Sequence, residues 1–313
     1  MGQVKNKIRR LIVLGLLFTL VIGISPDKIM AASAAKPKLK STSMRIWKGQ
    51  SQKIGIVNVK SEQIKNVTYS SSKKSVAKVS KNGVNFKMVY VEAGTFTMGS
   101  NSKNADYSES PMHKVTLTKD FLMGETEVTE ALWNAVMGNG NSSKTMPKTS
   151  VTWTEAHTFV DKLNQIAHKK NLIEKNQNFI LPTEAQWEYA AKGGKLSKNY
   201  KYSGSNKIDD VAQTLENTGS NSPVAVKGKM PNELGLYDMS GNAYEWVDDY
   251  AGSYSAKSQV NPQNTTPSGT YVKRGGSNYH RFSSEPYLFT TTGRYFYGST
   301  DWTIGFRIVL AEK

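Results

Sequence analysis

The chain of 313 residues contains no cysteine. It therefore cannot form a disulfide bond, hold a metal ion through thiolates or carry a lipid on an N-terminal cysteine. Acidic residues are also few, because 25 Asp and Glu stand against 41 Lys and Arg, and the formal net charge is +16. This basic balance predicts either an ordinary solvated surface or attraction to anionic cell-wall polymers. The cations are scattered along the chain, and we expect no nucleic-acid partner.

Long hydrophobic runs are absent apart from residues 11–24. This run is shorter than the roughly 20 residues that a membrane-spanning helix needs. Four basic residues precede it and small residues follow at 31–35, which is typical of a cleaved secretory signal peptide. We expect cleavage between Ala32 and Ala34, and hence a secreted or cell-surface protein. The alternative is an uncleaved N-terminal anchor.

The chain is expected to divide into a signal peptide at 1–34, a small β segment with its linker at 35–85, and a main domain at 86–313. Within the β segment, alternating β-branched residues and Ser- or Asn-Gly-rich turns predict short strands. The stretch 67–83 resembles bacterial immunoglobulin-like modules of surface proteins, but the last strands of such a module are missing. We therefore expect a truncated module, or one that borrows an edge from its neighbour.

Hydrophobic periodicity and capping residues predict three helices, at residues 129–137, 153–169 and 184–192. Each follows a threonine that can cap it, and two of these threonines begin a capping box. In the second helix one stripe of residues is expected to be buried: Ala156, Phe159, Val160, Leu163, Ile166 and Ala167. Beyond residue 195, Gly, Ser and Asn are frequent and predict loops and short strands. The fold class is therefore a loop-rich α+β domain.

Five groups of residues in the main domain follow one another in a characteristic order. They are GTFTMG at 94–99, EVT at 127–129, LPTEAQWE at 181–188, PNELGLYDMSGNAYEW at 231–246, and RGGS at 274–277 followed by GFR at 305–307. In this order and spacing they resemble the formylglycine-generating enzyme (sulfatase-modifying factor) family, over about residues 87–310. The resemblance implies the C-type-lectin-like fold of that family.

The resemblance does not extend to the catalytic residues. The family's enzymes oxidise a substrate cysteine with a copper ion held by two thiolates near the Gly-Gly-Ser motif. The matching positions here fall near His280 and Glu285, and copper(I) prefers sulfur ligands. We therefore expect no copper and assign no catalytic residue. An enzyme of the same family with altered, cysteine-independent oxidative chemistry remains an alternative.

The Gly-Asn-x-x-Glu-Trp segment is the predicted metal site. In the family the corresponding segment supplies a calcium site, and the resemblance implies Asn242, Ala243 and Glu245 as the ligands, with calcium in a structural role. Calcium takes carboxylate, amide and backbone carbonyl oxygens, which such a turn can supply. The alternative is that Asn242 caps a turn through its own backbone while Glu245 binds a buried backbone amide.

The segment 278–302 is rich in aromatic residues interleaved with Asn, Ser, Thr and Gly. Tyrosine among small polar residues is typical of antibody paratopes, because Tyr gives a large rigid contact area at low entropic cost. The segment also resembles the variable region of proteins diversified by retroelements. We predict a ligand-binding surface formed by Tyr279, His280, Phe282, Tyr287, Arg294, Tyr295, Tyr297, Asp301 and Trp302. The alternatives are that the aromatics are ordinary core and that Arg294, like Arg307, forms a buried ion pair with Glu245 or Asp248.

The sequence thus predicts an exported binding module of this family, without the family's catalytic cysteines. Its partner is expected to be a protein or a cell-surface ligand whose identity the residues do not specify, and no oligomeric state is predicted. A structural surface scaffold is the remaining alternative, in which the aromatic side chains would be buried.

Overall fold

The computed structural model describes residues 84–139 and 142–312, together with five short backbone strands before them. The chain divides into two compact units, Met1–Val76 and Ala77–Lys313. In the first unit β1 (Phe18–Ile22) pairs with β4 (Val67–Ser71), and β2 (Lys38–Leu39) pairs with β3 (Ile56–Val57), both antiparallel. The predicted cleavage region and most of the predicted immunoglobulin-like segment lie outside the described residues. Within the described part of the chain, no helix has the length and apolar character needed to cross a membrane.

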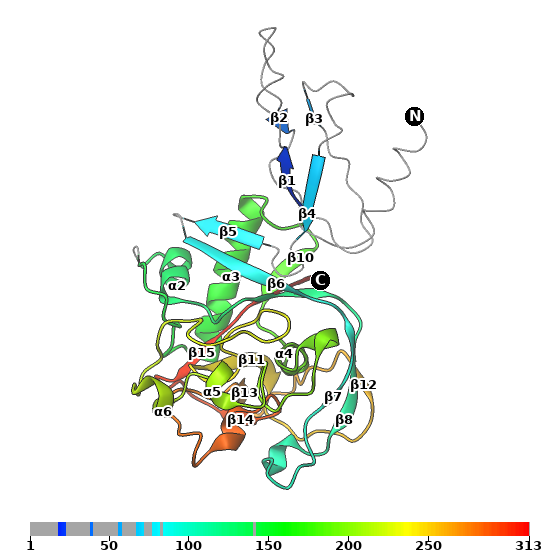
Figure 1. Ribbon diagram of the computed structural model, residues 1–313, viewed down its shortest axis with the longest axis vertical. Helices are drawn as coiled ribbons and strands as arrows, with labels where there is room; N and C mark the ends of the chain where they lie inside the picture. Colours follow the sequence, from blue (N-terminus) through cyan, green and yellow to red (C-terminus); the bar gives the residue numbers. More distant parts are fainter. Residues whose placement is uncertain are drawn as a thin grey trace. The chain divides into compact units, whose positions relative to one another are not determined.

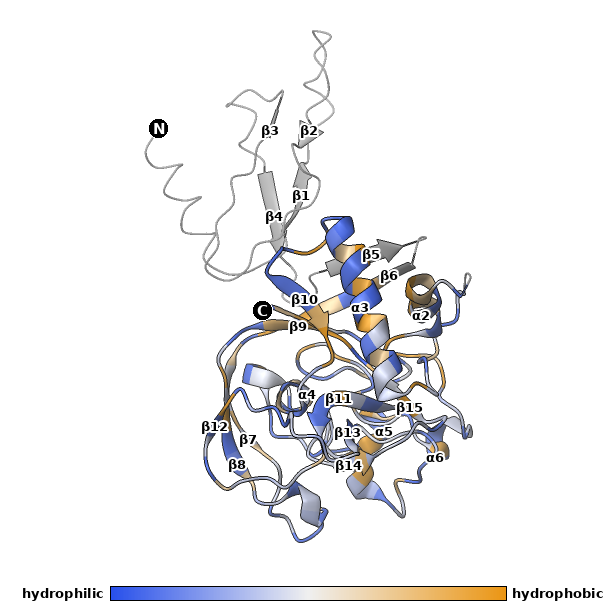
Figure 2. Cartoon of the chain, turned by 180° about the vertical axis from the view of Figure 1, so that it is seen from behind, coloured by the Kyte–Doolittle hydropathy of each residue, from blue (hydrophilic) through white to orange (hydrophobic). Residues whose placement is uncertain are grey.

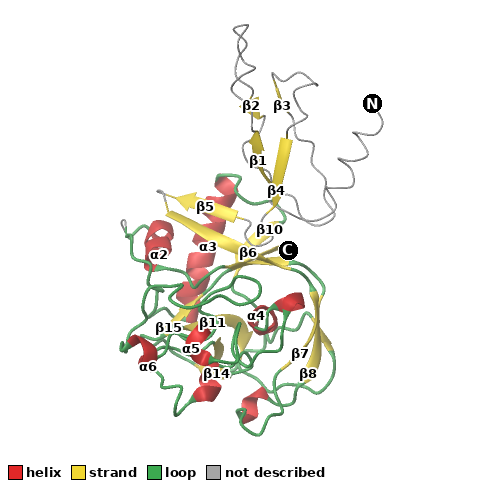
Figure 3. Ribbon diagram, viewed as in Figure 1, coloured by secondary structure: helices red, strands yellow, loops and turns green. Residues whose placement is uncertain are grey.

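The second unit is built from short strands and helices joined by long loops (Figure 3). A five-stranded sheet has the order β10-β16-β9-β6-β5, a four-stranded sheet the order β14-β13-β11-β15, and a three-stranded sheet the order β12-β8-β7. Their strands are β5 (Ala77–Lys81), β6 (Val84–Val91), β7 (Gly94–Met98), β8 (His113–Leu117), β9 (Phe121–Gly124), β10 (Gln177–Ile180), β11 (Tyr244–Tyr250), β12 (Gln259–Val260), β13 (Tyr271–Arg274), β14 (Arg294–Tyr297), β15 (Ile304–Phe306) and β16 (Val309–Glu312). This is the loop-rich α+β architecture that the sequence predicted.

The border between the units differs from the predicted domain border. β5 pairs antiparallel with β6 along its whole length, from Ala77 opposite Met88 to Lys81 opposite Val84. The strand that was assigned to the immunoglobulin-like segment therefore contributes an edge to the five-stranded sheet of the second unit. β9 lies between β6 and β16, so strands near both ends of the second unit belong to one sheet (Figure 1).

The three predicted helices are present and begin at their predicted caps. They are α2 (Glu130–Met137), α3 (Trp153–Lys169) and α4 (Glu184–Ala191). Thr152 with Glu155, and Thr183 with Gln186, form the predicted capping boxes. The stripe on α3 is buried as predicted except for Ile166, which is half-buried. Hydrophobic residues alternate with hydrophilic ones along this helix (Figure 2). Shorter helices occur at η3 (Tyr107–Glu109), η4 (Gly194–Leu196), α5 (Ile208–Val211), α6 (Leu215–Thr218) and η5 (Pro286–Phe289).

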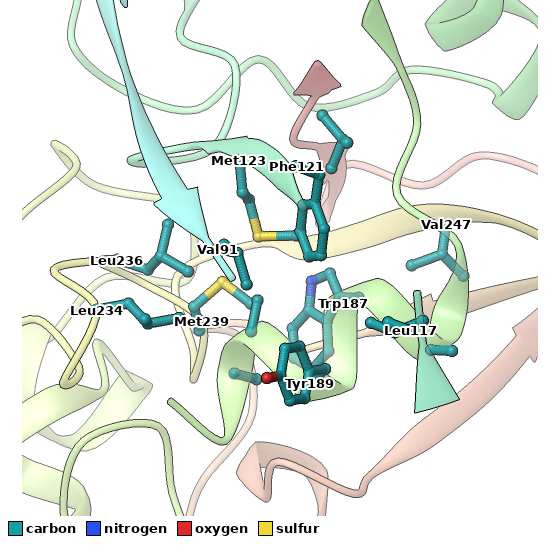
Figure 4. Packing of buried hydrophobic residues seen from close by; sticks show 14 of the residues in the cluster. Val91, Leu117, Phe121, Met123, Trp187, Tyr189, Leu234, Leu236, Met239 and Val247 are labelled. Carbon is teal, nitrogen blue, oxygen red and sulfur yellow. The ribbon is translucent and has the colours of Figure 1, made fainter. Parts of the chain in front are cut away.

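The largest hydrophobic core surrounds the aromatic side chains of α4. Trp187 is fully buried and Tyr189 nearly so, and both belong to one cluster with residues of β6, β7, β8, β9 and β11. Figure 4 shows Trp187 at the centre of this cluster, with Tyr189, Met239 and Phe121 around it. α4 is short, and almost every residue in it is buried. The four-stranded sheet therefore packs against this buried helix in the centre of the core.

Candidate binding surface

The four-stranded sheet carries two chemically different faces. Residues directly opposite one another in neighbouring strands point to the same face, and successive residues of one strand point to opposite faces. Glu245, Arg274 and Arg294 lie opposite one another across β11, β13 and β14. The next row consists of Trp246, Lys273 and Tyr295, and Tyr271 pairs with Tyr297. One face is therefore ionic, and the other is aromatic with a single lysine in its middle row.

The ionic face contains a fully buried bidentate ion pair. Arg307, just after β15, donates through Nε and Nη2 to the two carboxylate oxygens of Glu245, both at 2.6 Å. The same guanidinium donates to the carbonyls of Gly124 and Tyr237, each at 3.0 Å. Trp187 adds a hydrogen bond from its indole nitrogen to Glu245 at 2.7 Å. Arg307 thus joins the sheet to β9 and the loop around residue 237, and Trp187 joins the same carboxylate to α4.

Two further arginines bind glutamates of α4. Arg294 forms a bidentate pair with Glu184 at 2.7 and 2.8 Å, and Arg274 binds Glu188 at 2.5 Å. Burial alone would raise the pKa of Glu188, yet the charges of Lys192 and Arg274 hold it below its ordinary value. Arg294 is only 2% exposed. It therefore lies in the ion-pair network and not on the exposed ligand-binding surface to which it was assigned, and its partner is neither of the two carboxylates proposed from the sequence.

Of the predicted calcium ligands Asn242, Ala243 and Glu245, the side chains of Asn242 and Glu245 are engaged within the protein. Both carboxylate oxygens of Glu245 are taken by Arg307 and Trp187, as described above. The side-chain oxygen of Asn242 accepts from the backbone of Val224 at 3.0 Å, and its amide donates to Glu127 at 3.1 Å. A carboxylate already neutralised by a bidentate guanidinium does not fit the role of a calcium ligand. Among the described residues, no group of three or more His, Asp or Glu side chains could hold a metal ion.

Two acidic groups beside this pair have perturbed protonation. Burial, followed by the charges of Asp238 and Glu245, raises the pKa of Glu127 well above its ordinary value. Burial also raises the pKa of Asp238 to about 6, although it accepts hydrogen bonds from the Lys227 backbone and the Gln213 side chain. The single guanidinium of Arg307 is therefore surrounded by three buried carboxyl groups, and its charge is essential to the balance of this region.

On the aromatic side, ring contacts connect side chains from four separate segments. The row begins in the loop before β15, where the ring centroid of Trp302 lies 5.0 Å from that of Tyr279, which in turn lies 5.4 Å from that of His280. The centroid of His280 lies 5.6 Å from that of Tyr244, and the centroid of Tyr244 lies 5.8 Å from that of Tyr295. Such edge-to-face contacts stabilise aromatic pairs beyond the area that they bury. We call this row, together with Tyr297 of β14, the aromatic surface.

Part of the aromatic surface is open to solvent. The exposed fractions are 48% for Tyr279, 42% for Trp302 and 38% for Tyr297, whereas Tyr244 at the centre of the row is buried. α3 covers another part of the same sheet face, where Trp153 stacks on Tyr271, the register partner of Tyr297, with the rings 4.4 Å apart. The protein itself therefore covers part of this face and leaves three large aromatic side chains exposed.

Lys273 lies between the buried ring of Tyr244 and the exposed ring of Tyr297. Its ammonium nitrogen is 4.0 Å from the centroid of Tyr244 and 4.7 Å from that of Tyr297. The carboxylate of Asp301 lies 3.8 Å away, and burial of the lysine lowers its pKa in spite of that neighbour. Cations over tyrosine faces are attracted by the ring quadrupole. The lysine thus holds Tyr244, Tyr297 and Asp301 together.

The other predicted residues divide between this surface and a second core. Tyr287 contacts Tyr295 at 6.4 Å between ring centroids, but it also packs, as Phe282 does, against a hydrophobic cluster around Phe289. The loop that carries Phe282 is held by Glu216, which accepts two backbone hydrogen bonds and one hydroxyl hydrogen bond from residues 282 and 283. Phe282 and Tyr287 therefore support the surface from below.

The two positions that match the family's copper ligands form a hydrogen-bonded pair. Nδ1 of His280 lies 3.0 Å from a carboxylate oxygen of Glu285. An imidazole and a carboxylate provide no sulfur, so this pair does not fit a copper(I) ion held by thiolates. We derive no oxidative step from it.

Two residues of this site were not found from the sequence. Tyr244 lies inside the segment interpreted as a calcium loop, and Lys273 precedes the buried Arg274 in a short strand. The alternation of β13 separates Lys273 from Arg274, but this signal has meaning only once the strand and its register are known.

Comparison with known proteins agrees with this geometry. Residues 73–312 match the sulfatase-modifying factor enzyme 1-like domain, which is more than two thirds of the chain. The chain belongs to the sulfatase-modifying factor family. It does so without any of the cysteines on which the family's enzymes depend. The fold is thus that of a family member, and the chain has no thiolate to hold a copper ion.

Individual relatives differ in how much of their length is matched. The chain is 34% identical over 206 residues to the chaperone protein LppX of Paenibacillus barcinonensis, covering 51% of this chain and 70% of that protein. It is 34% identical over 111 residues to the formylglycine-generating enzyme of Bos taurus, covering 31% of this chain and 29% of the enzyme. The solved structure of Treponema denticola variable protein 1 superposes with a TM-score of 0.64 at 28% identity, covering 76% of this chain and 99% of that chain.

Proposed function

We propose that this protein is an exported binding module that recognises a polypeptide partner through the aromatic surface. The observation that carries the proposal is the joint exposure of Tyr279, Tyr297 and Trp302 above one sheet face. Exposed aromatic side chains that gather on one face typically mark a binding site, and Tyr and Trp carry much of the energy of such interfaces. The ionic face behind them provides a rigid support, which lowers the entropic cost of binding.

The binding experiment uses a phage-displayed library of random peptides, selected on the purified wild-type chain. The Tyr279→Ala/Trp302→Ala double variant should lose the selected peptides, because it removes two of the three exposed rings of the surface. Val260→Ala is the matched control, since Val260 is 65% exposed on β12, in a different sheet. Peptides that bind the double variant as well as the wild type would contradict the proposal.

The similarity to a Treponema denticola variable protein supports a specific form of this function, in which the surface is diversified between isolates. Diversification by a retroelement would change codons of the aromatic surface within 278–302 and leave the arginines and glutamates of the ionic face unchanged, including Arg294 inside that segment. Sequencing the encoding locus in many isolates tests this directly. Uniform codons in 278–302 would leave a binding module with one fixed ligand.

The similarity to the chaperone protein LppX supports a second candidate, in which the bound polypeptide is an exported protein that has not finished folding. An exposed aromatic surface can shield apolar segments of such a chain. The test is whether the wild type suppresses aggregation of a heat-unfolded reporter while the Tyr279→Ala/Trp302→Ala variant does not. Equal suppression by both proteins would place any chaperone activity elsewhere.

A further inference from the structure

Lys273 lies beside the exposed ring of Tyr297 in the aromatic surface, and any role for it in recognition rests on the binding function proposed above. Its side chain is only 11% exposed, so its ammonium group has lost most of its water. An ammonium group has three hydrogen-bond donors. The faces of Tyr244 and Tyr297 attract the charge but accept no ordinary hydrogen bond from it.

Asp301 is the acidic group near this ammonium, but it does not satisfy it. The distance from Nζ to the carboxylate is 3.8 Å, which is beyond hydrogen-bond length. The other oxygen of Asp301 accepts from both the backbone nitrogen and the hydroxyl of Thr303. These bonds fix the carboxylate to its own loop. Asp301 therefore forms a long ion pair with Lys273, and no described acceptor lies within ordinary hydrogen-bond length of the ammonium.

The charged groups His280, Glu285 and Glu216 of the neighbouring loops are engaged within the protein. His280 and Glu285 lie 3.0 Å apart and bind one another, and Glu216 is occupied by the backbone of residues 282 and 283. Arg294 and Arg274 point to the opposite face of the sheet, where glutamates of α4 neutralise them. Lys273 is thus the cation on the aromatic face of the sheet that lacks an acceptor within hydrogen-bond distance among the described residues.

We propose that Lys273 is the recognition site for a carboxylate on the polypeptide partner, an Asp or Glu side chain flanked by apolar residues. The acidic group would accept hydrogen bonds from the ammonium between the rings of Tyr244 and Tyr297. The flanking apolar residues would pack on Tyr279 and Trp302. A hydrogen bond to a charged group contributes about 1.5–3 kcal/mol, so its loss should weaken binding roughly 10- to 100-fold.

The test extends the peptide selection with Lys273→Met, which keeps the length of the side chain and removes its charge. Lys175→Met is the matched control, because Lys175 is exposed in the turn between α3 and β10. Wild-type and control selections should enrich peptides with Asp or Glu beside an apolar residue. The Lys273→Met selection should lose the acidic preference while it keeps the apolar one.

A second measurement changes the peptide and uses only the wild-type protein, so it does not depend on a variant that folds. The strongest wild-type peptide is resynthesised with its acidic residue replaced by the corresponding amide, and both peptides are titrated against the wild type. The amide peptide should bind about 10- to 100-fold more weakly to the wild type. Equal binding of both peptides would overturn the role of Lys273 but leave the aromatic binding function standing. If the wild type selects no peptide that the Tyr279→Ala/Trp302→Ala variant fails to bind, the binding function itself fails, and the role of Lys273 with it.

Discussion

Replacing Arg307 with methionine is the most direct test of the ion-pair network. The change leaves the buried carboxylate of Glu245 without its cation and removes the donors to the carbonyls of Gly124 and Tyr237. Breaking a buried ion pair by removing one partner costs about 3–5 kcal/mol, because the other charge stays buried and unpaired. For a unit of this size, such a loss lowers Tm by about 10 °C.

The penalty of Arg307→Met should also depend on pH. Glu127 and Asp238 already have raised pKa values, and the charge of Arg307 opposes that rise in both. Without the guanidinium, the pKa values of these carboxyl groups rise further, so the native variant takes up protons at a higher pH than the native wild type. The stability linked to these protons is present at low pH and is lost as the pH rises. The penalty should therefore be smaller near about pH 5.5 than near about pH 8.

Urea unfolding followed by tryptophan fluorescence measures both effects. The control is Arg307→Met/Glu245→Met, which replaces the pair by apolar side chains and should recover a large part of the lost free energy of unfolding. The recovery should be incomplete, because the indole N–H of Trp187 then lacks its acceptor. A cost below about 1 kcal/mol for the single variant, or a penalty that does not change with pH, would refute the reasoning.

Three further predictions concern titration, metal binding and backbone strain. Burial, followed by the charge of a neighbouring glutamate, raises the pKa of Asp249 to about 7. The stability linked to this proton is complete below about pH 4 and is lost as the pH rises through 7. Between about pH 5 and about pH 8, the free energy of unfolding of the wild type should therefore fall by about 2 kcal/mol more than that of Asp249→Asn, measured in urea titrations. Because Glu245 is engaged by a guanidinium, millimolar calcium or EDTA should leave Tm unchanged, and a rise above about 2 °C with calcium would show a site that this geometry does not provide. Gly276→Ala should destabilise the protein more than Gly269→Ala does, although both glycines have a positive φ (76° and 77°). A Cβ at 276 would lie 2.9 Å from a backbone carbonyl oxygen, whereas a Cβ at 269 meets nothing within 4 Å. Equal losses of stability in thermal melts would exclude that clash.

The helices could be predicted because their signals are local. A threonine followed three residues later by Glu or Gln satisfies backbone donors within one turn, so Thr152 and Thr183 mark helix starts without reference to the rest of the chain. The buried stripe of α3 follows from periodicity in the same way. Its exception, Ile166, lies near the end of the helix and is half-buried, a detail that depends on neighbouring elements.

The partners of the arginines could not be predicted, because they depend on the register of distant strands. Arg294 binds Glu184 across 110 residues of sequence, and Arg307 binds Glu245 across 62. The sequence indicated that both arginines could form buried pairs and suggested Glu245 or Asp248 as partners. That suggestion holds for Arg307, whereas Arg294 is committed to α4. A carboxylate three residues from an asparagine looks the same in sequence, whether it binds a metal ion or an arginine guanidinium.

The aromatic surface shows why composition can reveal a surface without revealing its centre. The density of aromatics in 278–302 pointed to Tyr279, Tyr297 and Trp302, which the structure places together. The residues that organise them, Tyr244 and Lys273, lie on neighbouring strands, each directly beside a buried charged residue of the ionic face. Since a shift of one residue in register would exchange the two faces, no composition count could assign these two side chains to the surface.

The separation of the two faces also determines which positions can change. The arginines and glutamates of the ionic face hold one another through bidentate or buried hydrogen bonds, so a substitution at any of them leaves a buried charge. Tyr279 and Trp302 touch mainly each other and solvent, and substitutions there should cost less than about 1 kcal/mol. A fold with this division can tolerate many side chains on its aromatic surface at nearly constant stability. That property suits a binding module, whether its surface is diversified between isolates or fixed for one partner.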